Sequence, residues 1–304
     1  MKGLVMKSTG SWYSVRIEDG RELPCRTRGK LRLEGYKESN PIAVGDHVEV
    51  ELSGSEGVIT FIHERENHML RQSVKKTGHS HVLAANLDQV MLMASLRQPR
   101  TSMGFIDRFL VTAEAFRIPQ ILLLNKTDLL DEVERTQLRQ ISNLYQSIGI
   151  QVREISVLND DLTFLKEIFK GKVTLLAGHS GVGKSSLLNR LVPGLEHSVA
   201  EISDFSEKGV HTTTFAEMIS LDERTFIIDT PGVKEWGLVD MTQQEISDYF
   251  PEMRDRRLDC KFGSRCLHIN EPKCAIIAAA ESGTISATRY QSYLSMVLGE
   301  DNRK

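Results

Sequence analysis

Residues 178–185 read Gly-His-Ser-Gly-Val-Gly-Lys-Ser, between the apolar run 172–177 and a helical pattern at 184–191. This spacing matches the motif G-x-x-x-x-G-K-[ST], which forms a phosphate-binding loop where a strand precedes it and a helix follows. Its glycines let backbone N–H groups face phosphate oxygens, and the N-terminus of the helix adds its dipole. The stretch therefore predicts a nucleotide-binding α/β domain; the alternative is a glycine-rich turn that binds nothing.

Two side chains of this stretch have distinct expected roles. Lys184 is expected to reach the β- and γ-phosphates, and the Ser185 hydroxyl is expected to bind Mg²⁺. The predicted phosphate cradle comprises Gly178, His179, Ser180, Gly181, Val182, Gly183, Lys184, Ser185 and Ser186.

A second stretch predicts which base is bound. Asn125, Lys126, Thr127 and Asp128 follow the apolar run 119–124 and form an N-K-x-D element. The Asp128 carboxylate can accept hydrogen bonds from N1–H and the 2-amino group of guanine. Adenine offers neither donor there, and a buried carboxylate left unpaired is a strong basis for discrimination. The element therefore indicates GTP and GDP as ligands; without the phosphate loop it would be an ordinary turn at a strand end.

Ser156 follows a predicted strand at 150–155. A serine there is expected to contact the O6 side of guanine, although a serine that merely caps the strand end is the alternative. The element usually reads Ser-Ala in such proteins, and here it reads Ser156-Val157.

Two further segments point to the γ-phosphate and its metal. Residues 226–232 read Phe-Ile-Ile-Asp-Thr-Pro-Gly, an apolar strand that ends in D-x-x-G. Asp229 is expected to hold Mg²⁺, directly or through water, and the Gly232 N–H to sense the γ-phosphate. The alternative is a plain strand-end turn.

Residues 208–214 read Lys-Gly-Val-His-Thr-Thr-Thr and form the candidate switch I. One threonine, Thr213 or Thr214, is expected to complete the Mg²⁺ shell when the γ-phosphate is present, as in order–disorder switching. The sequence leaves the choice between them open, and a threonine-rich strand start is the alternative.

The order of these elements differs from that of Ras-like domains, which run phosphate loop, switch I, D-x-x-G, N-K-x-D and serine loop. Here the N-K-x-D element and the serine loop come first, and the other three follow. The same parts are cyclically shifted. Such a permutation can leave a packed sheet intact, because neighbouring termini can be joined and the ring opened elsewhere.

With these motifs, the chain resembles the ribosome small-subunit-dependent GTPase A family (RsgA, also called YjeQ or YloQ) over essentially its whole length. The resemblance implies a GTPase that assists late maturation of the small (30S) ribosomal subunit and is activated by it. It also implies contact with 16S rRNA, an N-terminal OB barrel and a C-terminal zinc domain.

The pattern of predicted strands and helices along the chain agrees with three domains. Residues 1–68 carry short β-rich runs with turns, which favours an OB-like barrel. Strand and helix patterns alternate over 69–240, which predicts a doubly wound α/β domain. A polar, basic joint at 65–81 connects the two. Residues 241–304 are expected to form a mainly helical, zinc-binding domain.

The expected zinc ligands are three cysteines and one histidine near the C-terminus: Cys260, Cys266, His268 and Cys274. Three thiolates and one imidazole complete a tetrahedral Zn²⁺ shell and leave no position for substrate, so one structural ion per chain is predicted. Five residues separate the first two cysteines, one more than in the family pattern. Buried cysteines beside a surface histidine are the alternative. Cys25 stands apart in the barrel.

Composition excludes a protein drawn to nucleic acid by bulk charge, because the formal net charge of the 304 residues is −3. No signal or membrane segment is visible, so we expect a cytoplasmic protein, and a monomer. Local basic clusters nevertheless occur in the barrel and the joint, and either rRNA contact or solvated turns would explain them. Their members are Arg21, Arg26, Arg28, Lys30, Arg32 and Lys37, then Arg71, Lys75 and Lys76.

The residue after Gly232 is Val233, where Ras-like proteins place a glutamine that orients the attacking water. Valine cannot do so, and His211 of switch I is the best candidate within the chain for that role. A histidine that only contacts RNA or solvent is the alternative. Two other functions stay open: an RNA-binding assembly scaffold with negligible turnover, and a permuted GTPase that serves the large subunit.

Overall fold

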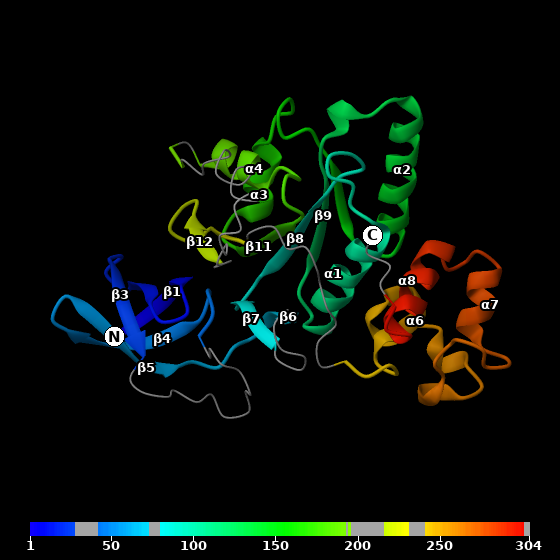
Figure 1. The fold of residues 1–304 in the computed structure, drawn as a ribbon, viewed down its shortest axis with the longest axis horizontal. Coiled ribbons are helices and arrows are strands. Elements are labelled where there is room, and N and C mark those ends of the chain that lie inside the picture. Colours follow the sequence, from blue (N-terminus) through cyan, green and yellow to red (C-terminus); the bar gives the residue numbers. More distant parts are fainter. Residues whose placement is uncertain (28–41, 73–79, 193, 196–215, 231–240, 301–304) are drawn as a thin grey trace, which may run out of the picture.

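The computed structural model describes residues 1–27, 42–72, 80–192, 194–195, 216–230 and 241–300 (Figure 1). Three regions of the chain lie side by side from left to right in this view: a small barrel, an α/β domain and a helical C-terminal region. Among the described residues, none of the helices is both long and apolar enough to cross a membrane.

The N-terminal region is a closed five-stranded barrel, as predicted. Each strand pairs with the next in the order β1-β2-β3-β5-β4, and β4 closes onto β1. The strands are β1 (Lys2–Ser8), β2 (Tyr13–Ile17), β3 (Glu22–Thr27), β4 (His47–Ser53) and β5 (Glu56–Ile62). Alternate residues point inward and fill the barrel with aliphatic side chains, the Tyr13 ring and the buried Cys25 thiol.

The joint that the sequence predicted at 65–81 contains a β-hairpin instead. Its strands are β6 (His68–Gln72) and β7 (Ser80–Ala85). Met69 and Ala84 are fully buried in the core of the α/β domain, so two apolar positions turn this polar stretch into paired strands. At its start, Arg65 forms a doubly hydrogen-bonded ion pair with the buried Asp46, at 2.7 Å to both carboxylate oxygens. The pair fixes the segment between β5 and β6 to the turn just before β4.

The central domain is a doubly wound sheet in the order β10-β9-β8-β11-β13-β12. Its strands are β8 (Gln89–Ala94), β9 (Gln120–Leu124), β10 (Gln151–Glu154), β11 (Val173–Gly178), β12 (Glu217–Ser220) and β13 (Phe226–Asp229). All neighbours are parallel except β12, an antiparallel strand that also pairs with β1 of the barrel. The strand before the phosphate loop, β11, thus lies mid-sheet although it is the fourth along the chain.

Helices cover both faces of this sheet. They are α1 (Met103–Ala115), α2 (Glu132–Ser147), α3 (Thr163–Phe169) and α4 (Lys184–Leu191). The strands alternate between two cores: Val90 and Leu92 of β8 pack with α1 and α2, whereas Met91 and Met93 pack with α3 and α4. Because both faces are buried, the strands read as continuous apolar runs, which is what made them visible in the sequence.

The C-terminal region has its own core. Its short elements are η2 (Ile246–Tyr249), α6 (Pro251–Arg254), η3 (Arg257–Asp259), η4 (Gly263–Arg265), α7 (Ala275–Glu281) and α8 (Ala287–Val297). Val111 of α1 belongs to this core, so the helix is shared between the central domain and the C-terminal region.

Candidate nucleotide site and metal centre

Asn125 holds three loops of the predicted nucleotide site together. Its side-chain Nδ2 donates to the Val182 carbonyl in the phosphate loop at 2.8 Å, and its Oδ1 accepts from the Val157 N–H at 2.9 Å. Asn125 is buried, so neither bond competes with water. The structure thereby brings the N-K-x-D element, the serine loop and the phosphate loop to one edge of the sheet.

The other members of the N-K-x-D element lie at the surface of this edge. Lys126 adopts a left-handed backbone conformation, with φ 67°, and its Nζ donates to the carbonyl of Gln98. Thr127 and Asp128 form a short 3₁₀ turn, η1 (Thr127–Leu129), and Asp128 is exposed. An exposed carboxylate at this place is available to a base.

Ser156 is buried and lies directly beside the N-K-x-D element, because the Thr127 N–H donates to the carbonyl of Ile155. The Ser156 hydroxyl accepts from the Asn159 N–H at 3.3 Å, and the Ser156 N–H donates to Asp160 at 2.7 Å. These contacts are those of a strand-end cap. The position of Ser156 is the predicted one, and its contact with guanine stays a prediction.

The phosphate loop requires glycine where its backbone approaches neighbouring strands. Gly183 has φ 113°, and a Cβ there would lie 2.4 Å from Nδ2 of Asn125. Gly178 has φ 151°, and a Cβ there would lie 2.5 Å from the carbonyl of Met93. A side chain larger than hydrogen would clash at both positions. Tertiary packing therefore requires glycine at these two positions of the motif, in addition to any requirement of the ligand.

Lys184 is buried within the loop that it is expected to serve. Its Nζ donates to the carbonyls of Gly178 at 2.8 Å and His179 at 3.1 Å. Burial lowers the pKa of Lys184, and the nearby negative charge of Asp229 opposes that shift. Asp229 ends β13, beside β11, and Thr230 anchors the strand end by donating to the Leu176 carbonyl at 3.0 Å.

Ser185 and Ser186 lie on the first turn of α4, and both are partly exposed. The rest of the predicted γ-phosphate machinery lies outside the described residues: His211, Thr213, Thr214, Gly232 and Val233.

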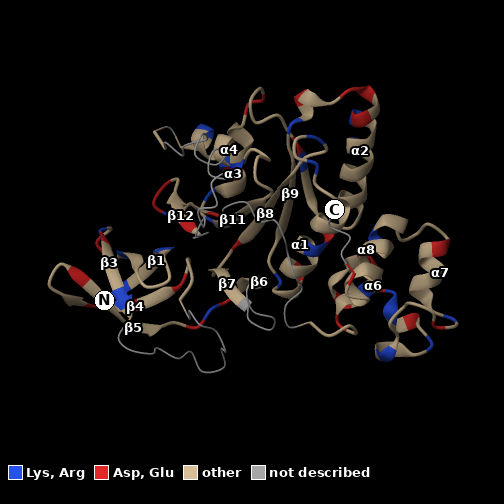
Figure 2. Ribbon diagram, in the orientation of Figure 1, with Lys and Arg blue, Asp and Glu red and all other residues tan. Residues whose placement is uncertain are grey.

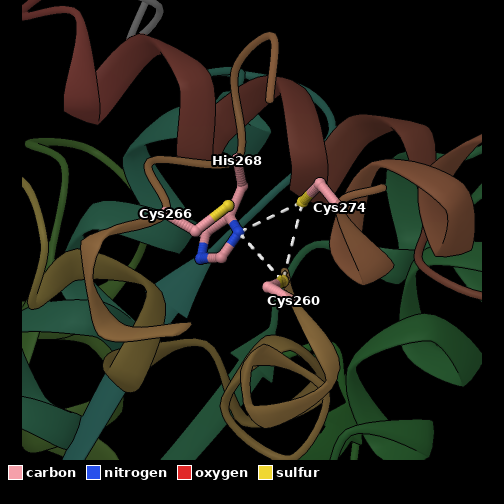
Figure 3. A group of neighbouring side chains, drawn as sticks. All are labelled: Cys260, Cys266, His268 and Cys274. Carbon is pink, nitrogen blue, oxygen red and sulfur yellow. Dashed lines mark hydrogen bonds between the residues drawn. The ribbon is translucent and has the colours of Figure 1, made fainter. Parts of the chain in front are cut away.

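The four predicted zinc ligands meet in the C-terminal region (Figure 3). Their donor atoms all lie within 4.8 Å of one another, and all four residues are buried. The Cys260 and Cys274 sulfurs are 3.7 Å apart, and His268 Nδ1 lies 3.6 Å and 3.3 Å from them. Zn–S bonds of about 2.3 Å at a tetrahedral angle give a sulfur–sulfur distance of about 3.7 Å. The donor set therefore fits Zn²⁺, and Cys260 reaches it despite the longer spacing.

Burial favours the neutral forms of the side chains in the cluster. Burial lowers the pKa of His268 to about 4, so its imidazole is neutral near pH 7 and can ligate. Burial raises the pKa of Cys274 to about 12. The loop that carries His268 is clamped by Glu271, which accepts three backbone N–H bonds. The alternative of a surface histidine is wrong, because His268 is 1% exposed.

Some residues of these sites carried no signal in the sequence. Gln98 holds Lys126 through a backbone carbonyl, which any residue type would supply. Tyr290 and Tyr293 of α8 donate to the carbonyls of His268 and Leu267, at 2.7 Å and 2.8 Å. Their i, i+3 spacing looked like an ordinary helix face.

The described part of the barrel carries both basic and acidic residues (Figure 2), and two arginines of the basic cluster are paired with carboxylates. Arg21 pairs with Asp19, and Arg26 pairs with Glu56 and lies over the Trp12 ring. The other members of the two basic clusters are Arg28, Lys30, Arg32, Lys37, Arg71, Lys75 and Lys76; the backbone of Arg71 lies in β6, but its side chain and the other six residues lie outside what the structure describes.

A mainly parallel sheet with a phosphate loop, an N-K-x-D element and a cyclically shifted motif order defines a circularly permuted P-loop GTPase. The profile of the RsgA GTPase family matches residues 62–239, and that of the RsgA N-terminal domain matches residues 2–59. The chain belongs to the RsgA GTPase family.

Relatives resemble the chain over its full length. The small ribosomal subunit biogenesis GTPase RsgA of Bacteroides fragilis is 48% identical, over 100% of this chain and 98% of the relative. The structure of YjeQ from Thermotoga maritima matches with a TM-score of 0.76 and 33% identity, covering 100% of this chain and 99% of that one. YloQ, described as a circularly permuted GTPase, matches with a TM-score of 0.72 and 30% identity, over 100% and 96%.

Proposed function

We propose that this GTPase binds guanine nucleotide at the edge organised by Asn125, hydrolyses GTP, and acts in biogenesis of the small ribosomal subunit. One observation carries the nucleotide site: the Asn125 side chain joins Val182 and Val157, which lie 57 and 32 residues away along the chain. By bonding both the phosphate loop and the serine loop, this side chain sets the position of the phosphates relative to the base of a bound nucleotide.

Each loop then has a distinct task. Asp128 pairs with guanine N1–H and the 2-amino group, and Ser156 lies on the O6 side of the base. The loop from Gly178 to Ser186 surrounds the phosphates, with Lys184 held by two of its own carbonyls. Since this lysine is already held in place, the loop needs little rearrangement when phosphate binds.

Ser185, Asp229 and one threonine of switch I, Thr213 or Thr214, are the residues that would hold Mg²⁺. The donors are hydroxyl and carboxylate oxygens, which this hard cation prefers. When bound, Mg²⁺ neutralises charge that develops on the β- and γ-phosphates. The Gly232 N–H would sense the γ-phosphate.

Hydrolysis needs a group that orients water, and we assign that role to His211. The position after Gly232 is Val233, which cannot hydrogen-bond to water. Intrinsic turnover is therefore slow, and docking on the small subunit brings His211 toward the γ-phosphate.

The Cys₃His centre holds one structural Zn²⁺ per chain, because its four donors fill the shell and leave none for substrate. The relatives are named for small ribosomal subunit biogenesis, which supports the 30S subunit and its 16S rRNA as partners. A partner of this kind supports a location in the cytoplasm, and we expect the protein to act as a monomer.

The test is GTP turnover titrated with purified small or large subunits. We expect the small subunit to raise turnover by about 100-fold or more, compared with the roughly 10³- to 10⁵-fold that activating partners give other GTPases. The large subunit should leave turnover unchanged. Tight, guanine-specific binding without any stimulated turnover would instead identify a scaffold that uses GTP as a clamp, and stimulation by the large subunit would overturn the assignment of partner.

A further inference from the structure

The imidazole of His179, within the phosphate loop, packs on the ring of Phe105 in a tilted stack. Their centroids are 4.0 Å apart and the rings are inclined by 33°. Phe105 is fully buried in the first turn of α1, and the side chain of Ser102 caps that turn by accepting from the Phe105 N–H. One face of His179 therefore rests on a rigid helix, while its backbone carbonyl accepts from Lys184.

The next part of α1 is held by the C-terminal region. Asp107 is fully buried, and Oδ1 of its carboxylate accepts from Arg289 of α8 at 2.6 Å and from Tyr145 of α2 at 2.7 Å. Arg289 is 1% exposed, bonds Glu252 through Nε at 2.7 Å, and lies over the Phe250 ring at 4.4 Å. A buried, multiply bonded guanidinium of this kind has one arrangement, so it fixes α8 against α1.

The same helix, α8, also holds the metal centre. Tyr290 and Tyr293 follow Arg289 on α8 and donate to the carbonyls of His268 and Leu267, next to two of the zinc ligands. Contacts therefore run without a break from the His268 loop through α8 and α1 to the phosphate loop.

We propose that Phe105 and His179 are positioning residues of the phosphate cradle, and that α1 couples this cradle to the zinc centre through Asp107 and Arg289. The stack holds the loop segment whose carbonyl orients Lys184. The C-terminal region holds α1 in the place where the stack can form. This inference rests on the proposed use of the cradle for guanine nucleotide.

A double-mutant cycle on GDP affinity tests the stack, with a fluorescent GDP analogue as the probe. An aromatic pair of this kind is worth a factor of about three to ten in an equilibrium constant. Phe105→Leu and His179→Ala should each weaken GDP binding by about that factor. The double variant should be no weaker than the single variants, because both remove the same contact.

Two further variants separate positioning from general damage. Phe116→Leu makes the same change at the other end of α1, where Phe116 packs on His68 at 4.5 Å, and it should leave GDP affinity unchanged. His179→Phe keeps a ring on Phe105 and should restore affinity lost in His179→Ala. Strictly additive effects of the two substitutions on GDP affinity would contradict a positioning role for the stack. So would a His179→Phe variant that binds GDP as weakly as His179→Ala.

Coupling to the zinc centre has its own measurement. Zinc affinity, obtained by equilibrium competition with a chromophoric chelator, should rise about fivefold or more when GDP saturates the wild-type protein. Phe105→Leu, which leaves all four ligands intact, should bind zinc but lose this dependence on GDP. Equal zinc affinity with and without GDP in the wild type would refute the coupling.

These outcomes are distinct from failure of the proposed function. If guanine nucleotide does not bind at all, the nucleotide site itself is wrong. If guanine nucleotide binds and subunit-stimulated turnover is seen, but the double-mutant cycle is additive, only the positioning role of Phe105 and His179 is wrong.

Discussion

The side-chain amide of Asn125 donates to the backbone carbonyl of Val182 at 2.8 Å, across 57 residues of chain. The first residue of the N-K-x-D element is thereby bonded to the middle of the phosphate loop. Because its carbonyl oxygen also accepts from Val157, one side chain sets the spacing between the N-K-x-D element, the serine loop and the phosphate loop.

Asn125→Ala should weaken GTP binding by about tenfold or more. It leaves the Val182 carbonyl and the Val157 N–H without their partner in a buried site, and each such loss costs about 1–3 kcal/mol. Equilibrium titration with a labelled GTP analogue measures the change. Asn143→Ala, on the exposed face of α2, is the matched control. Equal affinities in the two variants would remove Asn125 from the site.

Asp128→Asn should change the choice of base. The amide presents a donor where the carboxylate accepted from guanine, so GTP affinity should fall by about 100-fold and xanthosine triphosphate should become the preferred ligand. Competition between the two nucleotides gives the ratio. Asp131→Asn, three residues further on at the N-cap of α2, should keep both its cap and the preference for guanine. Unchanged GTP affinity in Asp128→Asn would sink the assignment of base recognition.

Zinc should support the C-terminal region. Elemental analysis should find about one Zn²⁺ per chain, because one Cys₃His set is present among the described residues. Cys266→Ser, or chelation, should unfold the region beyond residue 250, since metal binding free energy is folding free energy here. Proteolysis read by mass spectrometry would locate the unfolding. The control Cys25→Ser alters a buried thiol outside the cluster and should retain the ion. Wild-type protein that contains no zinc and is still natively folded would refute the structural role of zinc.

His211→Ala should abolish most subunit-stimulated hydrolysis, by about 10²- to 10⁴-fold, the usual contribution of a positioned proton-transfer group. GTP affinity and co-sedimentation with the small subunit should stay nearly intact, which separates catalysis from binding. His81→Ala changes an exposed histidine of β7 and serves as the control. If stimulated turnover survives in His211→Ala, the ribosome itself supplies the catalytic group.

The sequence by itself determined the class of fold and the motifs that make up the candidate sites. Doubly buried strands such as β8 and β9 must be continuously apolar, and a phosphate loop must carry its glycines and lysine in one short run. The cyclic order of the motifs could be read directly, since order is a property of the chain. The Cys₃His set was equally visible, because its ligands lie within fifteen residues.

Only the tertiary structure decided how these parts are held in place. The hairpin β6–β7 was hidden in a basic stretch, because its strands are set by burial of Met69 and Ala84 against residues distant in sequence. Asp107 and Arg289 gave no motif, since a buried ion pair across 182 residues needs only two complementary charges in reach of each other. The stack of Phe105 on His179 likewise depends on where α1 lies. Local sequence patterns reflect the secondary structure and burial of each segment. Contacts between segments distant in sequence form only when the chain packs, so no local pattern predicts them.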